Sequence, residues 1–79
     1  MYHLYILHLS NGSYYIGSTS DLTKRLAEHA GGRVRSTKKF LPCGLIYCEP
    51  YSDRSRAQGR EYQIKKWKSR AAIERLLKK

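Results

Sequence analysis

Hydrophobic and polar positions follow patterns along the chain that predict three β-strands. Residues 2–9 are apolar on both alternating faces, which is typical of an inner strand covered on two sides. An Asn-Gly pair follows, a strong hairpin signal, and residues 13–19 form the return strand. A third strand is predicted over 44–49, where Pro50 ends it.

Three helices are predicted over about 21–30, 53–67 and 70–78, because apolar residues recur there at intervals of three and four. The order strand, strand, helix, strand, helix, helix indicates an α+β fold, with a small three-stranded antiparallel sheet flanked by helices. No repeat or linker divides residues 1–79, so we expect one domain. Each predicted helix follows a residue that can cap it: Ser20 or Asp21, Ser52 or Asp53, and Ser69.

The length of the first hairpin loop decides whether two tyrosines share a face of the sheet. A two-residue loop would place Tyr5 and Tyr15 on opposite faces. A three-residue loop, with Gly12 left-handed in a bulge, would pair Tyr5 with Gly17 and put both phenols on one face. A site that contains both tyrosines needs the second register, which is the one we predict.

The charge balance points to a polyanionic partner. The chain has 16 Lys and Arg against six Asp and Glu, and its pI is about 10.0. This excess of positive charge is typical of proteins that bind nucleic acid. There is neither a signal-peptide pattern nor an apolar run near the roughly 20 residues of a membrane span. We therefore expect a cytoplasmic protein, in which Cys43 and Cys48 are buried reduced thiols.

A basic loop, which could contain a turn of helix, is predicted over residues 33–42. Such a loop could follow a nucleic-acid backbone, or it could be a disordered, solvated connector. The residues that we expect to contact nucleic acid are Lys24, Arg33, Arg35, Lys38 and Lys39.

Three charged or titratable side chains are expected to point inward. Arg25 and His29 are four residues apart on one flank of the first helix, although a surface arginine and a helix-end histidine remain alternatives. Glu61 lies on the inner arc of the second helix, where a carboxylate is costly unless it is paired or binds a metal. The other acids fall at helix starts, at a strand end or on outer faces. The chain can therefore build a one-metal site more readily than a two-metal site.

These groups suit hydrolysis of a phosphodiester bond, which needs a positioned water and stabilisation of charge on the phosphate and the leaving oxygen. Arg25 can fork onto the phosphate, and a metal on Glu61 can take the leaving oxygen. A tyrosine can orient or deprotonate the water, although a free phenol has a pKa of about 10 and needs a nearby cation or metal-bound water. His29 could accept the proton in turn.

Four phrases carry a resemblance to a known family: residues 4–7, 15–18, 22–26 and 60–65. In order and spacing they resemble the GIY-YIG nuclease domain over nearly the whole chain, closest to its small stand-alone bacterial members. The resemblance implies hydrolysis of DNA without a covalent intermediate and one bound Mg²⁺ or Mn²⁺. We expect the two tyrosine hydroxyls, the guanidinium and the single carboxylate to converge on one side of the sheet. The residues that match the family's site are Tyr5, Tyr15, Arg25, His29 and the metal ligand Glu61.

Two positions depart from the family's pattern. The first triplet reads His3-Leu4-Tyr5 instead of Gly-Ile-Tyr, and Asn11 is the only asparagine, whereas many members place one after the glutamate. We expect a metal-dependent DNA endonuclease of the bacterial cytosol or nucleoid. A chain this small offers little surface for reading a long sequence, so we expect selection by DNA structure. The alternative is a nucleic-acid-binding module on the same fold with weak or lost cleavage.

Overall fold

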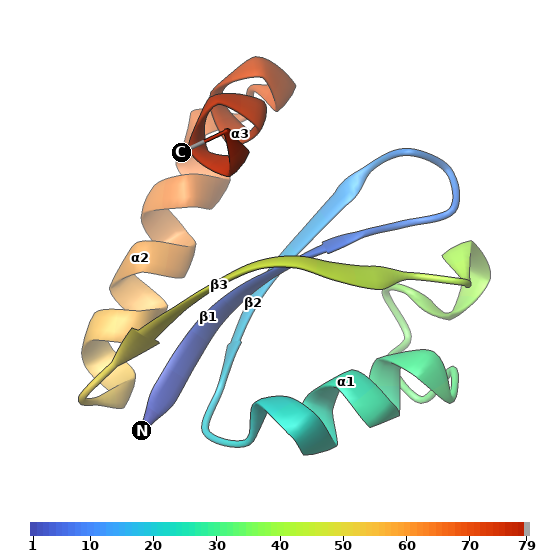
Figure 1. Cartoon of the computed structure of the whole chain (residues 1–79), viewed down its shortest axis with the longest axis horizontal. Coiled ribbons are helices and arrows are strands. Elements are labelled where there is room, and N and C mark those ends of the chain that lie inside the picture. The colour runs from blue at the N-terminus through green and yellow to red at the C-terminus, as the bar shows by residue number, and fades with distance from the viewer. Residues whose placement is uncertain (79) are drawn as a thin grey trace.

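The chain folds into a three-stranded antiparallel sheet with helices on both faces (Figure 1). The structure is a computed structural model, and it describes residues 1–78. This architecture confirms the predicted α+β fold. The elements are β1 (Tyr2–His8), β2 (Tyr14–Thr19), α1 (Leu22–Ala30), the 3₁₀ turn η1 (Lys38–Phe40), β3 (Gly44–Tyr51), α2 (Arg54–Trp67) and α3 (Arg70–Leu77).

The central strand is β1, since the strand order is β2-β1-β3. This confirms the inner strand expected from its continuous apolar run. Alternate side chains of the sheet enter two separate cores, one beneath α1 and one beneath α2 and α3 (Figure 1). The α1 core is built on Tyr5, Leu7 and Leu9, and the α2 core on Leu4, Ile6, Ile16, Ile64, Ile73 and Leu76.

The β1–β2 hairpin adopts the three-residue loop. The Leu9 N–H donates to the Ser13 carbonyl at 2.9 Å, and Gly12 has φ +86°. As a result Tyr5 lies opposite Gly17 and Leu7 lies opposite Tyr15. The predicted register is confirmed, and both phenols share the face of the sheet that α1 covers.

Each helix begins at a residue whose side chain accepts a hydrogen bond from a backbone N–H two or three positions on, which stabilises the helix start. These caps confirm the predicted starts. The caps are Asp21 to Lys24 N at 3.0 Å, Asp53 to Arg56 N at 2.8 Å, and Ser69 to Ala72 N at 3.3 Å. No helix within residues 1–78 has the length and apolar character needed to cross a bilayer.

The third strand differs from expectation in two respects. It continues through Pro50 to Tyr51, because an edge strand needs ladder hydrogen bonds on one side only and so tolerates a residue without an N–H. The cysteines are free, but Cys48 is exposed. It faces the α1 side at this outer strand, where Leu45 is also 40% exposed, so α1 does not cover β3.

Candidate active site

Tyr5 projects from the central strand directly over Gly17 of β2. A Cβ on residue 17 would come within 2.6 Å of the Tyr5 hydroxyl oxygen and 2.7 Å of the ring carbon that carries it. Gly17 has no positive φ, so a glycine is needed there for space and not for backbone freedom. The phenol itself is almost fully buried, at 1% exposure.

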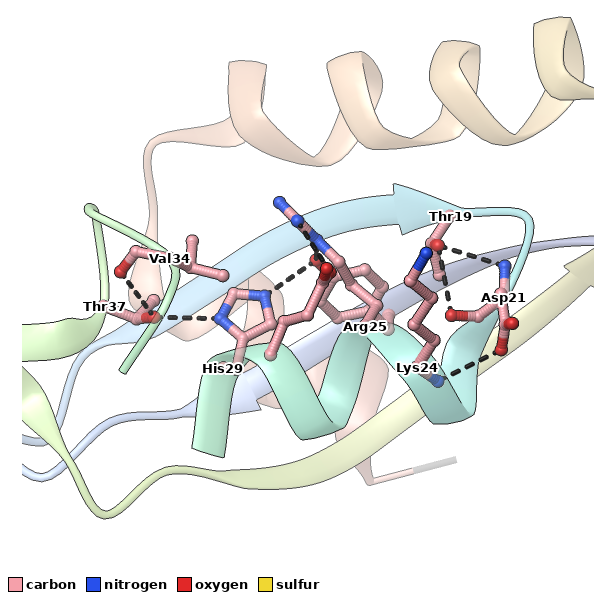
Figure 2. A network of polar contacts seen from close by, with 9 residues as sticks. Thr19, Asp21, Lys24, Arg25, His29, Val34 and Thr37 are labelled. Atoms are coloured by element: carbon pink, nitrogen blue, oxygen red, sulfur yellow. Dashed lines mark hydrogen bonds and ion pairs between the residues drawn. The ribbon is translucent and has the colours of Figure 1, made fainter. Parts of the chain in front are cut away.

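A chain of hydrogen bonds runs from α1 through Tyr5 and back to the segment after α1. Figure 2 shows Arg25 and His29 on the helix and Thr37 in the segment that follows it. The Arg25 Nε lies 3.4 Å from the Tyr5 hydroxyl, which lies 3.0 Å from the His29 Nε2. The His29 Nδ1 lies 2.8 Å from the Thr37 Oγ1. His29 and Thr37 are both completely buried, so the contact between them is shielded from water.

One arrangement of the protons gives every donor in this chain an acceptor. The Arg25 Nε can only donate, so the Tyr5 oxygen accepts from it, and in this arrangement the Tyr5 proton points to the His29 Nε2. The His29 proton then sits on Nδ1 and is donated to Thr37 Oγ1, whose hydroxyl turns to the Val34 carbonyl at 3.5 Å. The imidazole is therefore held with a lone pair aimed at the phenol.

Burial and charge keep both Tyr5 and His29 neutral at rest. Burial raises the pKa of the Tyr5 phenol, and the hydrogen bond from Arg25 opposes this only in part. Burial lowers the pKa of His29, and the positive charge of Arg25 lowers it further. The hydrogen bond to Tyr5 raises the pKa of Arg25 above its already high value. A permanent cation thus lies beside a protonated phenol and an unprotonated imidazole.

Tyr15 packs beside Tyr5 and His29. Its ring centroid lies 5.0 Å from that of His29, edge-on, and 6.2 Å from that of Tyr5. Tyr15 is half-buried, and its hydroxyl makes no hydrogen bond to any residue in 1–78. The hydroxyl is therefore available to a water or to a phosphate oxygen.

A cleft of about 550 Å³ lies between the start of α1 and the first half of α2. Arg25 borders it, and Figure 2 shows the guanidinium of Arg25 extending from α1 past β2 toward α2. Glu28 also borders the cleft and accepts from Arg25 Nη1 at 3.2 Å. The cleft thus gives solvent access to a guanidinium whose Nε is bonded to Tyr5. The other residues at its rim include Ser18, Asp21, Lys24, Arg54 and Gln58.

Glu61 enters from α2, which covers the opposite face of the sheet from the phenols. The expectation that all site groups lie on one side of the sheet is therefore wrong in this respect. The two faces meet at the free edge of β2, where Ser18 donates to Glu61 Oε1 at 2.7 Å and Lys65 to Oε2 at 2.6 Å. The Glu61 side chain is 22% exposed, so it is neither buried in the core nor turned to bulk solvent.

The comparisons with known proteins identify the family. The sequence pattern of the GIY-YIG catalytic domain matches residues 1–75. The chain belongs to the GIY-YIG family. This GIY-YIG protein is 42% identical over 77 residues to a UPF0213 protein of Halobacterium salinarum, covering 96% of this chain and 99% of that one. It is 37% identical over 67 residues to a UPF0213 protein of Streptococcus pneumoniae, covering 84% and 68% respectively.

A solved structure is similar over the whole fold. The solution NMR structure of the UPF0213 protein BH0048 from Bacillus halodurans has 31% sequence identity and a TM-score of 0.65. The match covers 99% of this chain and 84% of that one. The GIY-YIG domain places the protein in a family of nucleases.

The carboxylate of Glu61 and the hydroxyl of Ser18 are oxygen ligands that suit a hard divalent cation, but they need further ligands to complete a site. Within residues 1–78, no three His, Cys, Asp or Glu side chains gather in one place. Each Glu61 oxygen has one hydrogen-bond partner and keeps a second lone pair, and the Ser18 hydroxyl lies beside it. Mg²⁺ commonly binds through one or two carboxylates, with waters and substrate phosphates as the remaining ligands. Glu61 fits that pattern in this GIY-YIG protein.

The five basic residues expected to contact nucleic acid fall in two places. Lys24 borders the cleft beside Arg25. The other four are exposed at the far end of α1, in a segment that is ordered, since Thr37 is buried and η1 provides the predicted turn of helix. The cleft therefore gathers only one of the five. The four remote residues are Arg33, Arg35, Lys38 and Lys39.

Sequence reasoning missed three side chains that complete the site. Ser18 holds Glu61, Glu28 holds Arg25, and Thr37 holds His29. Glu28 is one of the acids that the sequence predicts on an outer face, although its position three residues after Arg25 is a local signal for this ion pair. Ser18 and Thr37 carry no such local signal, because their partners are 43 and eight residues away in the sequence.

Proposed function

We propose that this GIY-YIG protein is a metal-dependent endonuclease that hydrolyses phosphodiester bonds in DNA. The observation that carries the proposal is the directional chain from Arg25 through Tyr5 to a neutral, buried His29. Perturbed titratable groups linked to a cleft are more often found at catalytic sites than elsewhere. The family membership and the net charge of +10 support the same function and a nucleic-acid substrate.

In this proposal Arg25 binds the scissile phosphate. A guanidinium has five N–H donors, and Tyr5 and Glu28 engage two of its nitrogens. The remaining donors can reach into the cleft, where a planar fork matches two phosphate oxygens. Because Tyr5 and Glu28 already hold the guanidinium, little side-chain entropy is lost when it binds phosphate.

Tyr5 and His29 provide the path for the proton of the attacking water. When the phenol of Tyr5, which is 1% exposed at rest, opens to the cleft beside Arg25, it takes the water proton as it passes its own proton to the His29 Nε2, so no free phenolate has to form first. The hydroxyl of Thr37 keeps the imidazole in the tautomer that can accept. Tyr15, with an unengaged hydroxyl beside His29, orients the water or a phosphate oxygen.

Glu61 is the residue that would hold the metal, with Ser18 fixing its carboxylate. A bound Mg²⁺ or Mn²⁺ would supply electrophilic stabilisation of the leaving oxygen. The Lys65 ammonium lies 2.6 Å from the same carboxylate and offsets part of its charge. We therefore expect the affinity for metal to be weak in the free protein and to rise when substrate phosphates are present.

The proposed substrate is DNA chosen by its structure, such as single strands, flaps or branches. The cleft is lined by hydroxyl-bearing side chains and by the cations Lys24, Arg25 and Arg54, which suit contacts to phosphate oxygens, and contacts of that kind carry no sequence information. A long defined cleavage sequence would require additional protein surface.

The test is incubation with single-stranded, duplex and branched DNA, with Mg²⁺ or Mn²⁺ and with chelator. Arg25→Ala and Glu61→Gln should each lower the cleavage rate by about a hundredfold or more, the size of losing one transition-state contact. Arg56→Ala is the matched control, since its side chain is 72% exposed, forms an ion pair with Asp53 and does not border the cleft. Circular dichroism should show all three variants folded.

The outcomes separate two functions. Cleavage that survives both Arg25→Ala and Glu61→Gln would point to a contaminating nuclease or another site. Binding without cleavage in any metal would instead support a nucleic-acid-binding module. The Lys65 ion pair on Glu61 is the observation that favours this second reading, because it competes with a metal for the carboxylate.

A further inference from the structure

A second pocket, of about 340 Å³, lies at the opposite end of β2 from the cleft beside Arg25. Its floor is apolar and formed by Ile16, Ile64 and Ile73, and its rim is polar and basic. An apolar floor beneath cationic side chains suits a nucleotide, whose sugar and base are partly apolar and whose phosphate is anionic. The rim residues are Ser13, Lys65, Lys68, Ser69 and Arg70, with Tyr14 beside them.

One flank of α2 connects the two pockets. Arg54 and Gln58 border the cleft, whereas Lys65 and Lys68 border the second pocket. With Glu61 between them, these residues recur at intervals of four and three, so they lie on one stripe of the helix. The stripe is about 21 Å long at the usual helical rise. The stripe follows the free edge of β2. Near its middle Glu61 accepts a hydrogen bond from Ser18 of β2, and at its end the second pocket includes Tyr14 of the same strand.

The cations at the second pocket are only partly neutralised by the protein. Lys68 makes no ion pair with any residue in 1–78. Arg70 stacks 5.2 Å from the Tyr14 ring and donates to Glu74 through Nε at 3.2 Å, while its two Nη groups make no hydrogen bond within 1–78. These Nη groups and the Lys68 ammonium can bind a phosphate at this end of β2.

Lys68 also occupies a backbone position that a lysine disfavours. It ends α2 with φ 47°, and it is the one residue other than glycine with positive φ among those described. Glycine adopts this conformation without the steric cost of about 1 kcal/mol or more that a Cβ brings. A glycine here would suit the fold better, so replacing Lys68 with Gly separates the side chain's role in binding from the stability of the fold.

We propose that the second pocket binds another nucleotide of the DNA strand whose scissile phosphate lies at Arg25, with Lys68 and Arg70 contacting its phosphate. The strand then crosses the molecule along the free edge of β2, past Glu61 and Lys65. This assignment rests on the proposed function, because that function places the scissile phosphate of the DNA strand at Arg25. Its test is a binding measurement that does not require cleavage.

The experiment compares Lys68→Gly with the wild type by fluorescence anisotropy, using a labelled single-stranded DNA long enough to span both pockets, in EDTA. We expect Lys68→Gly to melt at the same or a higher temperature. We expect its affinity to fall by roughly five- to tenfold at moderate salt, and the slope of log K against log salt to fall by about 0.7, the value for one lost phosphate contact on single-stranded DNA.

A second comparison uses Lys68→Gln as the test variant and Lys66→Gln as its matched control. Each variant removes one positive charge, and the two positions are two residues apart. Lys66 is exposed and lies over Tyr62, away from both pockets. Equal losses in the two variants would overturn the assignment, because general surface charge would then explain binding. If Arg25→Ala abolishes cleavage while Lys68→Gly binds as well as the wild type, the pocket assignment alone is wrong. If the wild type binds without cleaving and Lys68→Gly binds weakly, only the endonuclease proposal fails.

Discussion

The Tyr5 phenol occupies the space that a side chain at residue 17 would fill. These two residues are direct partners in the β1–β2 ladder, and the hydroxyl end of the Tyr5 ring lies over residue 17. The three-residue hairpin loop therefore fixes more than the pairing of two strands. It also places a glycine under Tyr5, so that the phenol can meet Arg25 and His29.

Replacement of Gly17 with Ala should displace the Tyr5 ring, since the added Cβ would meet both the oxygen and its ring carbon. We expect a stability loss of about 1–3 kcal/mol from overpacking. We expect a larger relative loss of cleavage, because the hydrogen bond to His29 depends on the ring position. Cleavage assays at a temperature where the variant is folded will separate the two effects. Full activity in a folded Gly17→Ala variant would show that the ring position is unimportant.

Gly59 is the matched case in which an added methyl group should help. It lies exposed inside α2, and a Cβ there would meet nothing within 4 Å. Gly59→Ala should stabilise the protein by about 0.5–1 kcal/mol through helix propensity and a less flexible unfolded chain. For a chain of this size that corresponds to a rise in melting temperature of several degrees. A lower melting temperature would mean that residue 59 has a packing role in solution.

Local patterns in the sequence were sufficient to predict much of this structure. The apolar run of β1 predicted its central place, because only a strand covered on both faces carries such a run. The caps at Asp21, Asp53 and Ser69 are contacts within one helical turn, and so they too could be predicted locally.

The parts that could not be predicted depend on contacts between distant elements. The extension of β3 through Pro50 depends on its place at the sheet edge, which only the strand order reveals. Glu61 lies on the α2 face because α2 covers the side of the sheet that α1 leaves free. The contact of Thr37 with His29 depends on how the basic segment folds back after α1.

Thr37→Val should weaken cleavage by removing the hydroxyl that holds the His29 Nδ1 proton. The substitution keeps the side-chain shape but leaves a buried donor without a partner, which costs about 1–3 kcal/mol. It also removes the preference for the tautomer that accepts from Tyr5. Thr37→Ser keeps the hydroxyl and should restore most of the rate. Equal rates in the Val and Ser variants would contradict a role for this hydroxyl.

Glu49 forms a second polar cluster, which shares no hydrogen bond with the proposed site residues, and should matter for stability alone. It accepts from Tyr51 at 2.6 Å and Arg60 at 3.0 Å, and also from Tyr47. Burial alone would raise the pKa of Glu49, but these hydrogen bonds outweigh burial and lower it. Glu49→Gln should cost about 2 kcal/mol, since it leaves Arg60 half-buried without its carboxylate. Chemical denaturation measures this, and cleavage at a temperature where the variant is folded should be unchanged.

The lowered pKa of His29 predicts how both cleavage and stability depend on pH. Burial and the charge of Arg25 lower this pKa below the value of about 6.5 that applies in the unfolded chain. Below that value the unfolded chain binds a proton more readily than the folded protein. The stability contributed by His29 is therefore complete above about pH 6.5 and declines as the pH falls toward the folded-state pKa.

The cleavage rate should decline as the pH falls, because His29 accepts a proton only while it is neutral. The apparent pKa of this decline should lie below that of an ordinary histidine. Rate measurements across pH 5–8 and denaturation at the same pH values test both statements. In His29→Gln the stability difference across this window should shrink, whereas His8→Gln, at an exposed position, should leave it unchanged. An apparent pKa above that of an ordinary histidine, measured from the fall of the wild-type cleavage rate at low pH, would mean that the imidazole is stabilised as a cation. His29 could not then be the group that takes the proton from Tyr5.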